Sequence, residues 1–174
     1  MTALLEAENI RIRFRSKNRV RALLDRDPDP FIDAVCGVSL DVKEGETVAL
    51  VGESGAGKTT LARSIIGLVT PQEGSITFQG QQLCGLSDRA FKPIRKDVAM
   101  MFQDPIGCLS PRLTVRSLVT EPFKIHGVKN INVKSETKRL LEMVGLTEAF
   151  AGRYPHQLSG GQARRVGVAR ALAL

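Results

Sequence analysis

Alternating apolar and polar positions predict a strand-rich N-terminal part of the chain. Apolar residues occupy every second position over residues 10–15, 38–42 and 74–80, a period of two that is typical of strands with one buried face. Residues 16–33 between the first two segments are polar and acidic, with two prolines, and predict a loop. The third segment, GSITFQG, is bounded by glycines and predicts a short strand.

Two further runs are apolar almost throughout. Residues 47–51 (TVALV) have the composition expected of a strand that is buried on both faces of a parallel sheet, and residues 98–102 (VAMMF) predict another apolar strand. A glycine-rich loop follows the first run, and residues 59–68 then predict a helix. The order of strand, loop and helix indicates an α/β fold.

The C-terminal third predicts helices. Residues 132–144 form an amphipathic pattern, and Gly145 stands where a helix-ending glycine belongs. A final helix is predicted to begin near Gly160 and to run to the end of the chain. The apolar face of the first helix would hold Val133, Leu140, Leu141 and Val144.

Composition narrows the class of protein. The 174 residues are 43% hydrophobic and 25% charged, which is close to the globular average. No apolar run approaches the roughly 18 residues of a membrane span, so we expect no transmembrane segment. Three widely spaced cysteines fit neither a disulfide framework nor a metal site. The net charge of +7 is compatible with nucleic acid, lipid headgroups or nucleotide phosphates.

Residues 52–59, GESGAGKT, match the phosphate-binding pattern G-x-x-x-x-G-K-[ST]. Glycines let backbone N–H groups converge on phosphates, and the helix that follows directs its positive end to the same place. Lys58 can reach the β- and γ-phosphates, and the Thr59 hydroxyl can ligate Mg²⁺. The candidate ATP-binding residues of this loop are Gly52, Glu53, Ser54, Gly55, Ala56, Gly57, Lys58, Thr59 and Thr60.

A second glycine motif, LSGGQ, occupies residues 158–162. Ser159 and Gln162 can form a capping box, which by itself does not require two glycines between them. Gly160 and Gly161 add bare N–H groups at a helix start, and the motif therefore predicts a second anion site. One nucleotide can use both sites if two chains meet head to tail.

The pair of motifs resembles the ATP-binding subunits of ABC transporters. Segments MFQDP (101–105), LSPR (109–112) and RYPHQ (153–157) resemble the oligopeptide, dipeptide and nickel importer branch. The resemblance extends from about residue 35 to residue 174. It implies an α/β P-loop NTPase core with an antiparallel β lobe and an inserted helical signature lobe.

The resemblance also implies roles for single residues. Gln103 would ligate Mg²⁺ and help to place the attacking water. Ser159, Gly160, Gly161 and Gln162 would contact the γ-phosphate of ATP that is held by a partner subunit. An aromatic side chain upstream of the phosphate loop stacks on adenine in this family, and Phe31 is the best-placed candidate, with Phe14 second.

The implied domain is a nucleotide-binding domain over residues 1–174, with a β lobe and P-loop core (1–100), a Q-loop and helical lobe (101–160) and the start of the signature helix (160–174). Its implied partners are a second ATP-binding subunit and the membrane subunits of an importer. It would lie at the cytoplasmic face of the cell membrane and energise import of peptides or a related small solute.

Two other functions stay open at this stage. A soluble ATPase of the same fold could act on nucleic acid or the ribosome, although the motif spacing leaves no room for a long coiled coil. The MFQDP and RYPHQ segments also favour the importer, so no nucleic acid is expected as a partner. The third possibility is a non-catalytic nucleotide-binding fragment.

The family pattern continues after the signature helix with an Asp-Glu pair and a switch histidine, and His126 and His156 do not match that histidine's position. We therefore expect the C-terminal part of the core to be missing from these 174 residues. We also expect that this polypeptide alone does not hydrolyse ATP at a useful rate, and that its unpaired sheet edge makes it poorly soluble.

Overall fold

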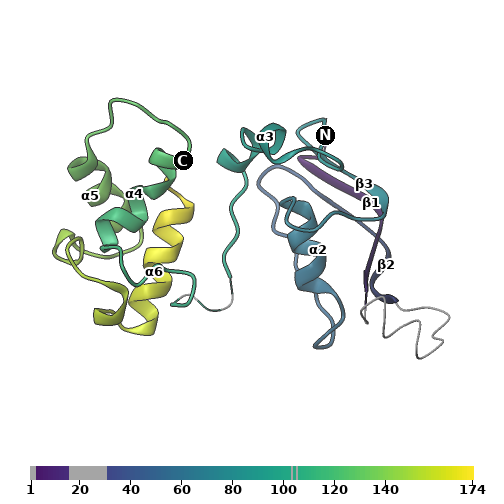
Figure 1. The fold of residues 1–174 in the computed structure, drawn as a ribbon, viewed down its shortest axis with the longest axis horizontal. Helices are drawn as coiled ribbons and strands as arrows, with labels where there is room; N and C mark the ends of the chain where they lie inside the picture. Colours follow the sequence, from purple (N-terminus) through teal and green to yellow (C-terminus); the bar gives the residue numbers. More distant parts are fainter. Residues whose placement is uncertain (1–2, 16–30, 103, 105) are drawn as a thin grey trace. The chain divides into compact units, whose positions relative to one another are not determined.

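The computed structural model describes residues 3–15, 31–102, 104 and 106–174, which fall into two compact units, Met1–Phe91 and Lys92–Leu174 (Figure 1). Residues 16–30 of the predicted loop and the candidate Gln103 lie outside the described residues. None of the helices in the described ranges combines the length and the apolar character needed to cross a bilayer.

The first unit is built on an antiparallel sheet. Its strands are β1 (Leu5–Arg15), β2 (Phe31–Val42), β3 (Glu73–Phe78) and β4 (Gln81–Gln82), in the order β2-β1-β3-β4. The three predicted alternating segments are therefore confirmed as strands. The prediction of a loop is wrong for residues 31–33, because these residues continue the ladder by pairing with residues 13–15 of β1.

Helix α2 (Lys58–Ile65) packs against β1 and β2. Leu61 of α2 is buried, as are Ile10 and Ile12 of β1, which confirms the inward face of the first strand. Phe14 on the same strand is 45% exposed, because it pairs with Ile32 near the end of the ladder. The short helix α3 (Asp88–Phe91) closes this unit, and the ring of Phe91 lies beside Gly67.

The two apolar runs at residues 47–51 and 98–102 are not strands in the structure, so the prediction of a strand is wrong for each of them. Val48, Leu50 and Val51 are 45%, 46% and 89% exposed. An apolar run becomes a strand only when a neighbouring strand accepts its hydrogen bonds, and within the described ranges neither run has such a neighbour.

The second unit is helical. Its elements are η1 (Ile94–Lys96), α4 (Val115–Ile125), α5 (Val133–Met143), η2 (Glu148–Phe150), η3 (Pro155–Gln157) and α6 (Gly160–Ala171). The core that joins α4, α5 and α6 includes the fully buried Leu118, Leu140 and Val166. The predicted last helix is confirmed, and it ends at Ala171, three residues before the end of the chain.

Helix α5 has a defining residue at each end. Asn132 accepts from the N–H groups of Lys134 and Ser135, each at 3.1 Å, and begins the helix. Gly145 has φ +68° and ends it. The predicted apolar face is wrong at Val133, which is 39% exposed because it is the first residue of the helix.

Candidate nucleotide-binding site

The phosphate loop at residues 52–59 is held against β2 by a glycine. Gly57 has φ +85°, and a Cβ at this position would collide with the backbone carbonyl of Ala34 and lie 3.3 Å from Val35 Cγ2. Gly55 also has φ +85°, but a Cβ there would meet nothing within 4 Å. The loop therefore requires glycine at residue 55 for backbone conformation, and at residue 57 for conformation and close packing.

Lys58 lies at the centre of this loop. Its Nζ donates hydrogen bonds to the carbonyl oxygens of Gly52 at 2.7 Å and of Glu53 at 2.6 Å. The Ala56 N–H donates to the Glu53 carbonyl at 3.2 Å and tightens the same turn. The loop thus curls around a fixed ammonium group, which is a charge that a phosphate can approach.

The start of α2 is open to an anion. Its N-cap is Gly57, no side chain caps the helix, and the first turn contains no acidic residue. The N–H groups of this turn and the helix dipole present positive charge at the end of the loop. Thr59 is exposed and Thr60 is half-buried in this first turn.

The second glycine motif also begins a helix. The Ser159 hydroxyl accepts from the Gln162 N–H at 3.3 Å, and the Gln162 side-chain oxygen accepts from the Ser159 N–H at 3.0 Å. This confirms the predicted capping box and makes no use of the N–H groups of Gly160 and Gly161. A Cβ at either glycine would meet nothing within 4 Å, so the packing of the chain itself does not require glycine there.

The segment before this motif contains a similar hydrogen bond from a backbone N–H to a glutamine side chain. The Tyr154 N–H donates to the side-chain oxygen of Gln157 at 2.8 Å, and the rings of Tyr154 and His156 stack at 5.7 Å. The guanidinium of Arg153 lies 4.4 Å from the centre of the Phe150 ring. His156 is exposed, and its ring stacks on that of Tyr154.

Phe31 stands at the first described residue of β2 and is 44% exposed. The guanidinium carbons of Arg13 and Arg15 lie 5.6 Å and 5.8 Å from the centre of its ring. Ala34, whose carbonyl contacts Gly57, is three residues further along the same strand. Three residues of strand span about 10 Å, so Phe31 and the phosphate loop are anchored on one rigid element.

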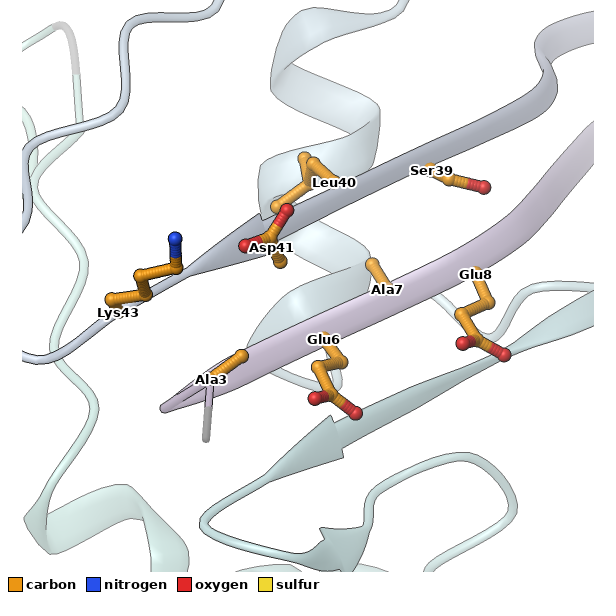
Figure 2. A pocket seen from close by; sticks show the side chains of 8 residues that line it. All are labelled: Ala3, Glu6, Ala7, Glu8, Ser39, Leu40, Asp41 and Lys43. Atoms are coloured by element: carbon orange, nitrogen blue, oxygen red, sulfur yellow. The ribbon is translucent and has the colours of Figure 1, made fainter. Parts of the chain in front are cut away.

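A cavity of about 590 Å³ opens beside β1 and β2 (Figure 2), and its lining residues do not belong to the phosphate loop. Glu6, Glu8 and Asp41 line it together with a single cation, Lys43. Glu6 and Asp41 are direct cross-strand partners. A lining with three carboxylates repels a triphosphate, so this cavity is not the nucleotide site.

No pattern in the sequence predicts the turn at residues 106–109, which the side chain of Asp104 caps. The Asp104 carboxylate accepts from the N–H groups of Ile106 at 3.1 Å and Gly107 at 2.9 Å. A Cβ at Gly107 would collide with the same carboxylate. In the sequence this turn begins three residues after Gln103, which lies outside the described residues.

A second cavity, of about 320 Å³, lies within the helical unit, and Arg95, Lys96, Glu121 and His126 are among its lining residues. Burial lowers the pKa of His126 below its ordinary value of 6.5, and the charges of Lys96, Lys92 and Arg95 lower it further. Burial and the neighbouring cations thus both favour the neutral imidazole of His126.

The described part of the chain has no group of three or more His, Cys, Asp or Glu side chains that could hold a metal ion. Thr59 supplies a hydroxyl oxygen at the start of α2, which is a ligand type that Mg²⁺ accepts. The remaining ligands of a magnesium ion would come from phosphates and water.

Comparison with known proteins identifies the fold and the family. Residues 35–174 match the family model described as "ABC transporter". The ATP-binding cassette MJ0796, solved as a dimer bound to ADP and Pi, superimposes with a TM-score of 0.82 at 31% identity, over 97% of this chain and 69% of that one. The α/β P-loop NTPase fold with a helical lobe is thereby confirmed.

Relatives with curated names are transport proteins. The oligopeptide transport ATP-binding protein AppF of Bacillus subtilis (strain 168) is 49% identical over 145 residues, 82% of this chain and 44% of AppF. OppF of Escherichia coli (strain K12), with the same description, is 39% identical over 98% of this chain and 51% of OppF. The glutathione import ATP-binding protein GsiA of Pectobacterium atrosepticum is 42% identical over 98% of this chain and 27% of GsiA.

The chain thus spans about half the length of the oligopeptide transport relatives that it matches. The matched region contains both glycine motifs and the segments on which the resemblance was based. By this match over most of its length, the chain belongs to the ABC transporter family.

Proposed function

We propose that this chain is part of an ATP-binding subunit that uses ATP hydrolysis to energise the import of peptides or a related small solute. The observation that carries the proposal is the presence of two helix starts, α2 and α6, that each combine bare backbone N–H groups with a fixed polar side chain. The names of the relatives support the transported class.

In this proposal the loop from Gly52 to Thr60 holds the phosphates of ATP. Lys58 exchanges the carbonyl oxygens of Gly52 and Glu53 for β- and γ-phosphate oxygens, which carry more negative charge. Because the ammonium is already fixed at the centre of the loop, little side-chain entropy is lost when the phosphates bind.

The signature residues act on ATP that is held by a second copy or a related subunit. The Ser159 Oγ accepts from the Gln162 N–H, which leaves its own O–H free to donate to a γ-phosphate oxygen. The N–H groups of Gly160 and Gly161 add two further donors, and Gln162 fixes the geometry through the capping box. Bound ATP would then hold two subunits together.

Mg²⁺ bound to ATP would neutralise charge on the phosphates during transfer. Thr59 and Gln103 are its proposed ligands from this chain, and Gln103 is also proposed to place the attacking water. Thr59 fits the role because its hydroxyl is exposed in the first turn of α2, beside Lys58. Phe31 is proposed to stack on adenine, since it is exposed on the strand that also anchors Gly57.

The proposed domain divisions remain 1–100, 101–160 and 160–174. Residues near 105–126 would face the membrane subunits, and the assembled protein would lie at the cytoplasmic face of the membrane. We further propose that residues 1–174 alone bind ATP without turning it over, because phosphoryl transfer needs an acidic metal holder and a water-polarising residue beyond those assigned above.

The test uses the full-length subunit that contains this chain, assembled with its membrane subunits. Lys58→Ala should abolish uptake of a labelled peptide and labelling of the loop by photoactivatable ATP. Lys43→Ala removes an equal charge from the acidic cavity and should change neither. Normal uptake by the Lys58→Ala protein would contradict the proposal.

A further inference from the structure

The cavity of about 320 Å³ in the helical unit has a predominantly basic polar lining. Its basic lining residues come from three elements, and they are Arg95 and Lys96 of η1, Arg170 of α6 and His126 at the end of α4. Glu121 is the one acidic residue that the described ranges contribute to the lining. Basic side chains from separate elements therefore surround one space, which favours an anionic ligand.

Arg170 is already fixed in position at this cavity. It is half-buried, and its Nη1 donates a hydrogen bond to the Cys108 carbonyl oxygen at 3.1 Å. A guanidinium carries several N–H donors in a rigid fork, so this bond leaves other donors for an anion. Because the bond restricts the side chain, little rotamer entropy is lost when Arg170 also contacts a ligand.

His126 has a polar atom that its own chain does not satisfy. Its Nδ1 is buried and has no hydrogen-bond partner within the described part of the chain. Burial lowers the pKa of His126, and the charges of Lys96, Lys92 and Arg95 lower it further, so the imidazole lies in a positive field. Either nitrogen of a neutral imidazole can carry the proton, and Nδ1 can therefore donate to an anion.

The lining favours phosphate over carboxylate. Donors on η1, α4 and α6 can each serve a separate oxygen of a phosphate group, whereas a carboxylate has only two oxygens. Pro122, Ile125 and Ala171 add apolar surface to the lining. The volume is at the lower end of the range of about 300–1,000 Å³ for small-molecule sites, which leaves room for a small carbon skeleton beside the phosphate.

We propose that this cavity binds an organic phosphate monoester, with the phosphate group held by Arg95, Lys96 and Arg170. His126 donates from Nδ1 to a phosphate oxygen, and the carbon skeleton lies against the apolar residues. None of the described lining residues belongs to the loop at residues 52–60. The monoester therefore binds without displacing ATP.

Equilibrium dialysis of labelled phenyl phosphate and labelled inorganic phosphate tests the site. The full-length subunit carries Lys58→Ala, so that the phosphate loop does not contribute to binding. Lys96→Gln should weaken the binding of both probes about tenfold, because a charge-assisted hydrogen bond is lost. Lys134→Gln removes an equal charge from the exposed start of α5, which contributes no described residue to the lining, and should keep both affinities within about twofold.

Glu121→Gln should have the opposite effect. It removes a carboxylate that repels the phosphate, and should tighten binding about fivefold. A misfolded variant would not bind more tightly, so this result separates electrostatics from loss of structure. As a second readout, saturation with phenyl phosphate should raise the pKa of His126 toward 6.5 in an NMR titration, since the phosphate opposes the field of the cations.

Vesicles distinguish a soluble monoester from a lipid headgroup. For a soluble ligand, vesicles with phosphatidic acid should displace phenyl phosphate no better than vesicles of phosphatidylcholine alone. Displacement that Lys96→Gln abolishes would assign the phosphate to a lipid in the same cavity. Absence of saturable binding by either probe, or equal affinity with and without Lys96→Gln, would overturn the inference. The proposed function is tested separately by uptake, and it stands if Lys58→Ala abolishes transport.

Discussion

Alanine substitutions at Gly55 and Gly57 distinguish two reasons why the phosphate loop requires glycine, which are backbone conformation and close packing. Both residues have φ +85°, a conformation that alanine adopts only with strain. Only at Gly57 would the added Cβ also meet another segment, the backbone of Ala34 and the side chain of Val35. The two variants therefore share the backbone strain and differ in packing.

The expected losses of ATP affinity follow from the free-energy costs of the backbone strain and of the packing contact. A left-handed alanine costs about 1–2 kcal/mol, and forcing a methyl group into a packed contact costs about 1–3 kcal/mol. Since about 1.4 kcal/mol is a factor of ten, Gly55→Ala should weaken ATP binding about 5- to 30-fold. Gly57→Ala combines both terms, about 2–5 kcal/mol, and should weaken binding at least about 30-fold.

Isothermal titration of ATP into the full-length variants measures both dissociation constants, and circular dichroism confirms that each variant is folded. The test is whether Gly57→Ala weakens ATP binding more than Gly55→Ala does. If Gly57→Ala bound ATP as tightly as Gly55→Ala, the contact between the loop and β2 would have no part in shaping the site, and the reasoning would be refuted.

Three further variants test other parts of the structure. Ser159→Ala removes both the N-cap of α6 and a phosphate donor, and should cost about 1 kcal/mol of stability in denaturant unfolding together with a fall in kcat. Asn132→Ala removes the N-cap of α5 and should cost a similar amount with no change in ATP affinity. His126 has a lowered pKa in the folded state, so the unfolded chain binds its proton more readily. Stability should therefore fall as the pH drops below 6.5, and His126→Gln should reduce that dependence in thermal unfolding curves at several pH values.

The sequence predicted those elements whose signals are local. The period of two located the three strands, Gly145 located the end of helix α5, and the capping box at Ser159 located the start of helix α6. Such signals suffice because a capped helix end or a half-buried strand face is specified by neighbouring residues.

Several features were missed or wrongly predicted because they depend on partners that are distant in the sequence. Residues 47–51 and 98–102 are apolar enough for buried strands, but pairing decides whether a strand forms. The bond from Arg170 to Cys108 and the contact of Gly57 with Ala34 join segments that are far apart in sequence, and no local pattern announces them. Helix α4 was not predicted for a local reason, because Pro122 inside it weakens the helical pattern.

In the proposed assembly, the phosphate loop of one subunit and the signature motif of another bind the same triphosphate. Gly161→Asp tests the signature half, because an added Cβ at Gly161 meets nothing within 4 Å, an acid suits a helix start, and its charge repels phosphate. Gly152→Asp, equally unobstructed, is the control.

The number of ATP molecules trapped by mixed dimers of the full-length protein tests whether each site forms between two subunits. A Lys58→Ala subunit paired with a Gly161→Asp subunit retains one complete site if the sites form between subunits, and should trap one ATP. A subunit that carries both changes, paired with wild type, should trap none. One trapped ATP in the second pairing and none in the first would contradict the shared site.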